Sequence, residues 1–310
     1  MNSTTKEILR ITFGLTFTCL FAAFVMGAVF VITAKAKKYN EYLNFQEKIF
    51  DILGYSETNP PPDGLQLNQI YRYIIEKDQA KYLGYIIPID SQESKQDAFE
   101  LVVIDLKGQL NTRKQITLST ENSREDRERK IAIQAVLPEA TAVIYADTFL
   151  SANLNSKRLA YLLPGKTPGF KTAIQFMLAL DSSYTIKGLE ILEHQEDPGL
   201  GAEIERNYFK KQFVGKTLKR VKTIDVVKKP LPEDYRNYLE PDPWKENSLS
   251  ESKLQEIHDT YKNNDIYAIT GATISSAAVT NGVKNALKKF TYRVQVLDQI
   301  ISENRIPAAF

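Results

Sequence analysis

The hydrophobic pattern begins with a long apolar segment, residues 11–34, in which no side chain is charged. A helix of about 24 residues reaches roughly 36 Å, enough to cross a hydrocarbon core of about 30 Å. Lys6 and Arg10 precede the segment and three lysines come after it. We predict a transmembrane helix over 11–34 behind a short tail, 1–10. A secretory signal peptide is the alternative, because Ala34-Lys35-Ala36 is similar to a cleavage site, but the apolar run exceeds a typical signal core.

Helical and alternating patterns succeed one another after this segment. Apolar positions at spacings of three and four predict helices over 39–55 and 123–135, and a proline-rich turn at 59–64 ends the first of them. Alternating or continuous apolar runs predict strands. A helix followed by strands occurs twice along the chain, and we expect these two parts to have similar structures. These runs occupy 82–88, 99–105, 142–145, 158–163, 173–180 and 186–192. The mixture predicts an α+β fold, with an antiparallel or mixed sheet and flanking helices.

A polar stretch over 225–262 interrupts the C-terminal half. It contains several prolines, and the single tryptophan, Trp244, lies near its middle. We predict a surface insertion, with Trp244 either a local packing anchor or an interface residue. The expected organisation is a membrane-proximal region over 35–123, a ligand-binding domain over 124–292 that contains the insertion, and a tail over 293–310.

Composition narrows the classes of function. The formal net charge is +2, and no nucleic-acid motif occurs, which disfavours a dedicated nucleic-acid binder. With one cysteine, Cys19, the chain has no intramolecular disulfide and no multi-cysteine metal site. The two histidines, His194 and His258, lie far apart in the sequence, so a metal site is also disfavoured.

The segment Tyr267 to Ala277, YAITGATISSA, places Thr273 on a turn of small residues just before a helical pattern. Backbone N–H groups at a helix start are unpaired, and the helix dipole favours negative charge there, so this hydroxyl is well placed to carry a phosphate. The plain alternative is a capped core helix, with Thr273 or Ser275 as its N-cap.

A second candidate segment is HQEDPGLG, from His194 to Gly201, directly after a predicted strand. Its proline and two glycines shape a tight loop that a flat ligand can approach closely. His194 and Glu196 could bind a polar ring edge, although a histidine beside a turn is more often a structural hydrogen-bonding group.

The two segments together, in this order and behind one anchor, resemble the FMN-binding G subunit of Rnf ion-translocating electron-transport complexes. The chain is also similar to the related C subunit of sodium-translocating NADH:quinone reductase. The resemblance covers the anchor and roughly residues 124–290, and the Ile274-Ser275-Ser276 continuation favours the Rnf type.

The resemblance implies that FMN is attached by a phosphoester to Thr273, and that a separate flavin transferase attaches it. Two departures matter: Tyr267 stands where an acidic residue is usual, and Asp197 stands where threonine is usual. No catalytic residue or metal ligand is implied. The cofactor-binding positions implied by the match are Thr270, Gly271, Ala272, Thr273, Ser275, Ser276, His194, Glu196, Pro198, Gly199, Leu200 and Gly201.

The function implied is an electron relay within a multi-subunit membrane complex, not catalysis by this chain alone. The flavin domain would face the periplasm or cell exterior of a bacterial inner membrane. Three alternatives stay open: the quinone-reductase type, a stand-alone extracytoplasmic flavoprotein, and an anchored scaffold without flavin.

Overall fold

The computed structural model describes residues 3–89, 98–155, 157–241 and 250–310. Two compact units divide the chain, residues 1–50 and 51–310. Trp244 and the middle of the predicted insertion lie outside the described residues. The domain boundaries drawn from the sequence therefore stay a prediction.

The first unit consists of most of helix α1 (Ser3–Leu53). Within it, the stretch Lys6–Ala34 is long and apolar enough to cross a membrane, by length and composition. No proline or glycine falls between residues 28 and 53, so nothing in the sequence breaks the backbone hydrogen bonds there. The predicted anchor and the helix predicted over 39–55 consequently form one helix.

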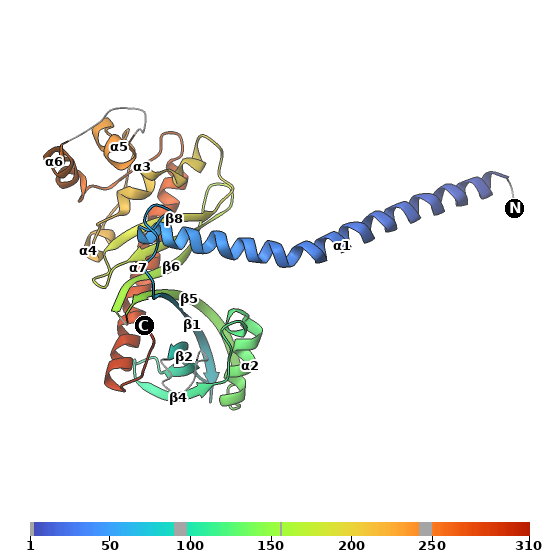
Figure 1. The fold of residues 1–310 in the computed structure, drawn as a ribbon, viewed down its shortest axis with the longest axis horizontal. Helices are drawn as coiled ribbons and strands as arrows, with labels where there is room; N and C mark the ends of the chain where they lie inside the picture. The colour runs from blue at the N-terminus through green and yellow to red at the C-terminus, as the bar shows by residue number, and fades with distance from the viewer. Residues whose placement is uncertain (1–2, 90–97, 156, 242–249) are drawn as a thin grey trace. The chain divides into compact units, whose positions relative to one another are not determined.

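The second unit is built on an antiparallel sheet. In the described residues, eight strands lie in the order β4-β3-β2-β1-β5-β6-β7-β8, so two four-strand meanders meet where β1 pairs with β5. In each half a helix precedes four strands, which is the similarity between the two parts that the sequence predicts (Figure 1). The strands are β1 (Leu65–Lys77), β2 (Ala80–Ile89), β3 (Ala98–Ile104), β4 (Leu110–Ile116), β5 (Ala142–Leu154), β6 (Lys157–Pro168), β7 (Ala173–Leu180) and β8 (Ile186–Glu193).

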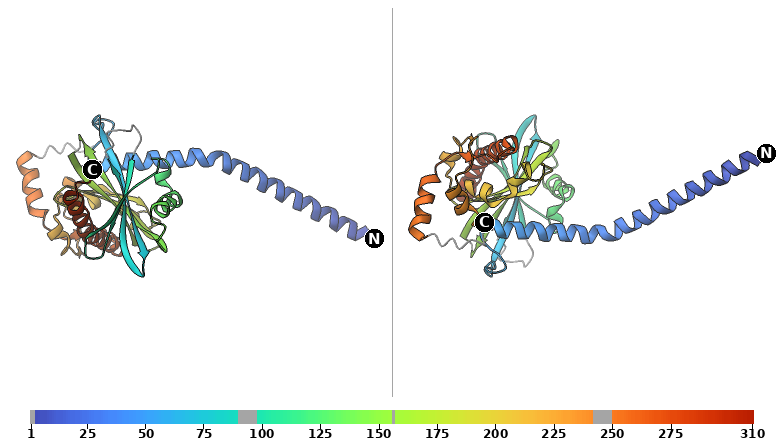
Figure 2. Two further views of the ribbon diagram at one scale, coloured as in Figure 1. Left: turned by 90° about the horizontal axis from the view of Figure 1, so that it is seen from below. Right: turned by 90° about the horizontal axis from the view of Figure 1, so that it is seen from above.

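Helices α2 (Asp126–Val136) and α7 (Thr273–Glu303) lie on opposite sides of this sheet (Figure 2). Successive strand side chains point to opposite faces, so Tyr71 joins a cluster with Ile133 of α2 while Ile70 joins the cluster beneath α7. Because both faces are covered, β1 to β3 are buried almost continuously along their central residues.

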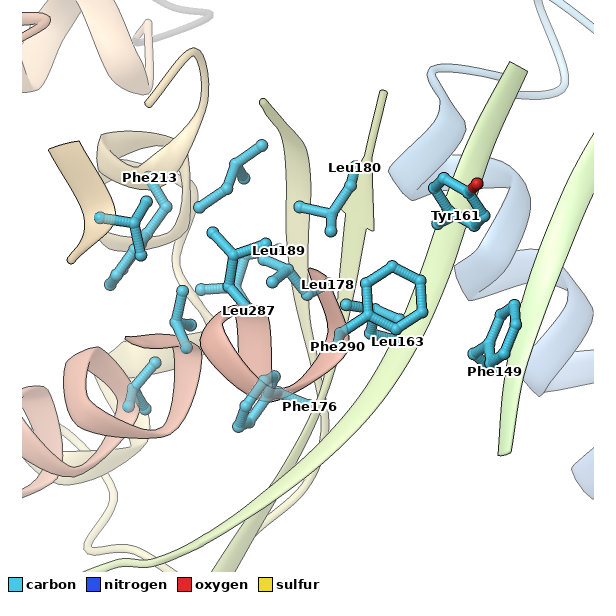
Figure 3. Close-up of a cluster of buried hydrophobic side chains, with 14 of the residues drawn as sticks. Phe149, Tyr161, Leu163, Phe176, Leu178, Leu180, Leu189, Phe213, Leu287 and Phe290 are labelled. Atoms are coloured by element: carbon cyan, nitrogen blue, oxygen red, sulfur yellow. The ribbon is translucent and has the colours of Figure 1, made fainter. Parts of the chain in front are cut away.

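Helix α7 contributes the longest apolar face to the core. Leu287 and Phe290 point toward sheet side chains that include Phe149 and Leu163 (Figure 3). Each fully buried side chain of this size stabilises the fold by about 1.5–3 kcal/mol. The helix continues to Glu303, beyond residue 292, and Leu297 and Ile300 are also buried.

Short elements connect β8 to α7. They include two small strands that pair in parallel, β9 (Val226–Val227) and β10 (Ile266–Tyr267). The helical ones are η2 (Gly201–Glu205), α3 (Asn207–Lys210), η3 (Lys211–Phe213), α4 (Leu218–Val221), α5 (Glu233–Leu239) and α6 (Glu251–Tyr261). A further short helix, η1 (Asn122–Arg124), precedes α2.

Candidate functional site

The turn before α7 is closed by Ser276. Its hydroxyl accepts a hydrogen bond from the backbone N–H of Ile269 at 3.0 Å and donates to the carbonyl of Ala272 at 2.9 Å. Gly271 has a φ of +80°, a conformation that glycine adopts without strain. The N-cap is Ala272, so the expectation that Thr273 or Ser275 caps the helix is wrong. Both residues already lie in helical backbone, and neither hydroxyl is in the capping position.

Thr273 is the first residue of α7 and is half-buried. Its hydroxyl forms no hydrogen bond with any other described residue, whereas the hydroxyls of Ser275 and Ser276 are both engaged. The first N–H groups of a helix have no acceptor within it, and the first turn of α7 contains no acidic residue. The position therefore combines a free hydroxyl with an environment that stabilises an anion.

Glu196 joins three segments of the site. Its buried carboxylate accepts hydrogen bonds from the backbone N–H groups of Phe170 and Lys171, each at 3.0 Å, and from the Ser275 hydroxyl. The turn between β6 and β7, the loop after β8 and the first turn of α7 are thereby held together. A buried carboxylate needs such donors, because an unpaired charge in the interior is strongly unfavourable.

His194 orients the same loop. Its Nδ1 accepts a hydrogen bond from the backbone N–H of Glu196 at 3.0 Å, and its Nε2 lies 3.0 Å from a carboxylate oxygen of Glu205. These contacts give both His194 and Glu196 an internal structural role. Their contact with a flavin stays a prediction.

The loop at 194–201 and the segment at 267–277 pack closely against each other at Gly201 and Gly271. A Cβ placed on Gly271 would lie 2.8 Å from Cδ2 of Leu200, and one on Gly201 would lie 2.9 Å from Oγ of Ser275. A side chain at Gly201 would overlap buried atoms of Glu196 and Ser275, whereas at Gly271 the exposed end of Leu200 could move aside and the positive φ is what favours glycine. The structure thus brings together residues that are about 70 positions apart in the sequence.

Other predicted site residues lie around this junction. Pro198 and Gly199 are exposed at the loop tip, where Gly199 has a φ of +72°. Thr270 is exposed just before the α7 turn. Asp197, one of the two departures, forms an ion pair with Lys171 at 2.5 Å.

Three exposed apolar side chains surround the junction. Phe170 is 60% exposed, Leu200 45% and Ile274 59%. Phe170 is held by Glu196 through its backbone, Leu200 lies against Gly271, and Ile274 comes directly after Thr273. Phe170 lies outside both sequence segments, and its link to the loop is formed only in the fold.

Tyr267, the other residue that differs from the family pattern, is held by hydrogen bonds to its backbone. Gln212, which is buried, accepts from the Tyr267 N–H at 2.8 Å and donates to its carbonyl at 3.3 Å. The ring packs edge-on against Tyr235, with centroids 6.4 Å apart. The tyrosine, six residues before Thr273 in the sequence, is therefore part of a packed aromatic cluster.

Part of the chain is similar in sequence to a known domain family and to known proteins. Residues 169–288 match the FMN-binding domain family, a range that contains both segments. The chain is 29% identical over 141 residues to the G subunit of the proton-translocating ferredoxin:NAD(+) oxidoreductase complex of Clostridium ljungdahlii, covering 46% of this chain and 58% of that protein. It is 29% identical over 126 residues to the G subunit of the Na(+)-translocating complex of Acetobacterium woodii, covering 41% and 46%.

Among solved structures, the C subunit of the Na(+)-translocating NADH-quinone reductase of Parabacteroides distasonis is similar, with 20% identity and a TM-score of 0.34. That similarity covers 66% of this chain and 77% of the other. The chain spans about half the length of the two G subunits that it matches. Residues 169–288 thus match the FMN-binding domain family, and the relatives to which the chain is similar are G subunits of ion-translocating oxidoreductase complexes.

Proposed function

We propose that this chain is a membrane-anchored electron-transfer subunit that carries FMN in phosphoester linkage to Thr273. The free hydroxyl of Thr273 at the start of α7, inside the matched FMN-binding domain, carries the proposal. The nearby hydroxyls of Ser275 and Ser276 are held by internal hydrogen bonds, which leaves Thr273 as the better-placed ester site.

Attachment is the task of a separate flavin transferase that uses FAD and a divalent metal. The Thr273 oxygen forms a bond to the phosphorus of the FMN moiety, the phosphoanhydride bond of FAD breaks, and AMP leaves while the hydroxyl proton is lost. The resulting phosphate is stabilised by the unpaired N–H groups and the dipole of α7.

The chain's own residues fit a bound flavin. Glu196 holds the loop after β8 against α7, and the glycines at 201 and 271 allow the close approach of these segments. Phe170, Leu200 and Ile274 offer apolar surface to a flat ring. When bound, the flavin supplies the redox chemistry, and the protein orients it and tunes its surroundings.

The proposed location rests on α1. Residues 11–34 would span a bacterial inner membrane, with the flavin domain on the periplasmic or extracellular side. That segment contains no ionisable side chain apart from the Cys19 thiol, so ion movement would be the task of other membrane and redox subunits of the complex.

The decisive experiment is co-expression of the full chain with a flavin transferase, followed by denaturing gel electrophoresis under ultraviolet light. A fluorescent band is expected from the unaltered chain and from Thr260→Val, and no band from Thr273→Val. Thr260 is the matched control because it is an exposed threonine outside both sequence segments. Intact-mass measurement of the chain from its native host without a flavin adduct would favour the flavin-free scaffold instead.

A further inference from the structure

A row of three polar side chains crosses the centre of the sheet. Arg72 of β1 lies directly opposite Tyr85 of β2 and Asp147 of β5 in the strand register. Directly opposed residues share a face, so all three point to the side that α7 covers. The register between β1 and β5 shifts immediately after Arg72, and irregularities of this kind often occur beside functional sites.

Positive charge exceeds negative charge where Arg293 of α7 meets this row. The Arg72 guanidinium donates two hydrogen bonds to the Asp147 carboxylate, one of them from Nε at 2.7 Å. Arg293 of α7 donates to the same carboxylate at 2.7 Å. Two guanidinium groups thus share one carboxylate, and the side chain of Arg72 is only 9% exposed. A second anion would offset the excess charge.

A pocket of about 300 Å³ lies against this cluster, between α7 and strands β1, β2, β5 and β6. Phe149, Leu163 and Phe290 form an apolar part of its wall, and all three are labelled in Figure 3. Exposed Lys166 and Lys289 also line it, and neither forms an ion pair or hydrogen bond with another described residue. The lining therefore holds four cations and one carboxylate, a net charge of +3.

Tyr85 supplies an independent indication of a ligand. Its side chain lines the pocket and is 1% exposed, and its hydroxyl has no hydrogen-bond partner among the described residues. Burial raises the pKa of Tyr85 to about 12, so the hydroxyl keeps its proton at neutral pH and can donate. An unpaired buried hydroxyl is unfavourable, and a ligand acceptor would remove that deficit.

The cationic end of the pocket lies away from the proposed ester at Thr273. Lys289 comes 16 residues after Thr273 on α7, roughly 24 Å along the helix axis at 1.5 Å per residue, whereas Gly282 at the near end of the lining comes 9 residues after it, roughly 14 Å. Nothing in the attachment chemistry uses Arg72, Tyr85 or Arg293.

We propose that this pocket binds a small organic carboxylate with an apolar body. The carboxylate lies at the cationic end, where it contacts Lys289 and lies near Arg72, Arg293 and Tyr85. The apolar body lies against the aromatic wall formed by Phe149 and Phe290. The volume is at the lower end of the range for small-molecule sites, which fits a single ring or a short chain.

Titration calorimetry of benzoate into the full chain in detergent, at low ionic strength, tests the proposal. We expect saturable binding at one site, weaker binding of the neutral isostere benzamide, and unchanged benzoate binding in Thr273→Val. Lys289→Gln should weaken binding on the order of ten-fold, as the loss of a charge-assisted contact does. Lys288→Gln is the matched control, because it makes the same charge change one residue away and does not line the pocket.

Tyr85→Phe separates binding from folding. Removing an unpaired buried hydroxyl should leave the free protein as stable as before or more stable, yet weaken benzoate binding. The proposal is overturned if benzoate gives no saturable heat, if benzamide binds equally well, or if Lys288→Gln and Lys289→Gln have equal effects. Full affinity in both Lys289→Gln and Tyr85→Phe, or loss of binding in Thr273→Val, also overturns it.

Discussion

Ser275 donates its hydroxyl hydrogen to the carboxylate of Glu196, across 79 positions of sequence. Both side chains are buried, and the same carboxylate holds two backbone N–H groups of the turn between β6 and β7. This one side chain therefore connects the loop after β8 to the helix that begins with Thr273. The consequences of that connection can be measured.

Ser275→Ala should lower the free energy of unfolding by about 1.5–3 kcal/mol, the usual range for a hydrogen bond to a charged group. The carboxylate would stay buried with one donor fewer. Urea unfolding of the full chain in detergent, followed by circular dichroism, measures the change. Ser182→Ala removes an exposed hydroxyl in a turn and should leave the midpoint unaltered; equal losses in the two variants would contradict the assigned role of Glu196.

Gly201→Ala should disturb the same junction by steric overlap. The added Cβ would lie 2.8 Å from Cβ of Glu196 and 2.9 Å from Oγ of Ser275, so one segment must move. We expect a loss of about 1–3 kcal/mol in stability, together with less flavin fluorescence on gels. Gly27→Ala in α1, where a Cβ would meet nothing within 4 Å, serves as the control. Normal stability and normal fluorescence in Gly201→Ala would show that the contact is not tight.

Within the eight-stranded sheet, the strands with a clear hydrophobic pattern were predictable from the sequence, whereas β1 and β4 were not. Strand β1 is buried on both faces and carries Arg72 at its centre, so neither an alternating nor a continuous apolar pattern marks it. Strand β4 is mostly polar and exposed at the edge of the sheet, and backbone pairing with β3 holds it there. Tertiary context, not local preference, decides such segments.

One part of the candidate site could likewise be predicted from the sequence, and the rest could not. Thr273 could be selected from a motif because a helix start is a local feature. The contact of Glu196 with Ser275, and the cluster of Arg72 with Asp147 and Arg293, depend on strand register and on where α7 crosses the sheet. A shift of one residue in register would send Arg72 to the opposite face, and the sequence pattern of β1 does not fix that register.

Lys216 gives the fold a measurable pH dependence. It is 2% exposed and donates to the carbonyls of Lys262 at 3.0 Å and Asn264 at 2.7 Å. Burial, together with the positive charge of Arg220, lowers the pKa of Lys216 from 10.5 to about 8. Between these two values the folded state binds fewer protons than the unfolded state, so the free energy of unfolding should rise with pH across this window.

Below pH 8 both states of Lys216 are protonated, and its contribution should be constant. Lys216→Met should lack the rise seen between about pH 8 and 10.5, by an amount on the order of 1–3 kcal/mol. The exposed Lys219→Met should retain the rise, and the comparison removes the effect of tyrosines that titrate in the same range. Parallel pH profiles for Lys216→Met and the unaltered chain would mean that Lys216 titrates normally.

Leu200 should affect the flavin more than the fold. It is 45% exposed, and its Cδ2 lies where a side chain on Gly271 would be. Replacement of an exposed side chain usually changes stability by less than about 0.5 kcal/mol, so Leu200→Ser should unfold at nearly the same urea concentration as the unaltered chain.

If Leu200 covers the flavin carried by Thr273, Leu200→Ser should admit more water and increase quenching of native-state flavin fluorescence by iodide. Val214→Ser, at a comparably exposed valine outside the junction, should leave the quenching unchanged. Equal quenching in all three proteins would place the flavin ring away from Leu200 while leaving the ester at Thr273 unaffected. An apolar side chain beside a flavin excludes solvent from the ring, which makes iodide access a direct readout of this contact.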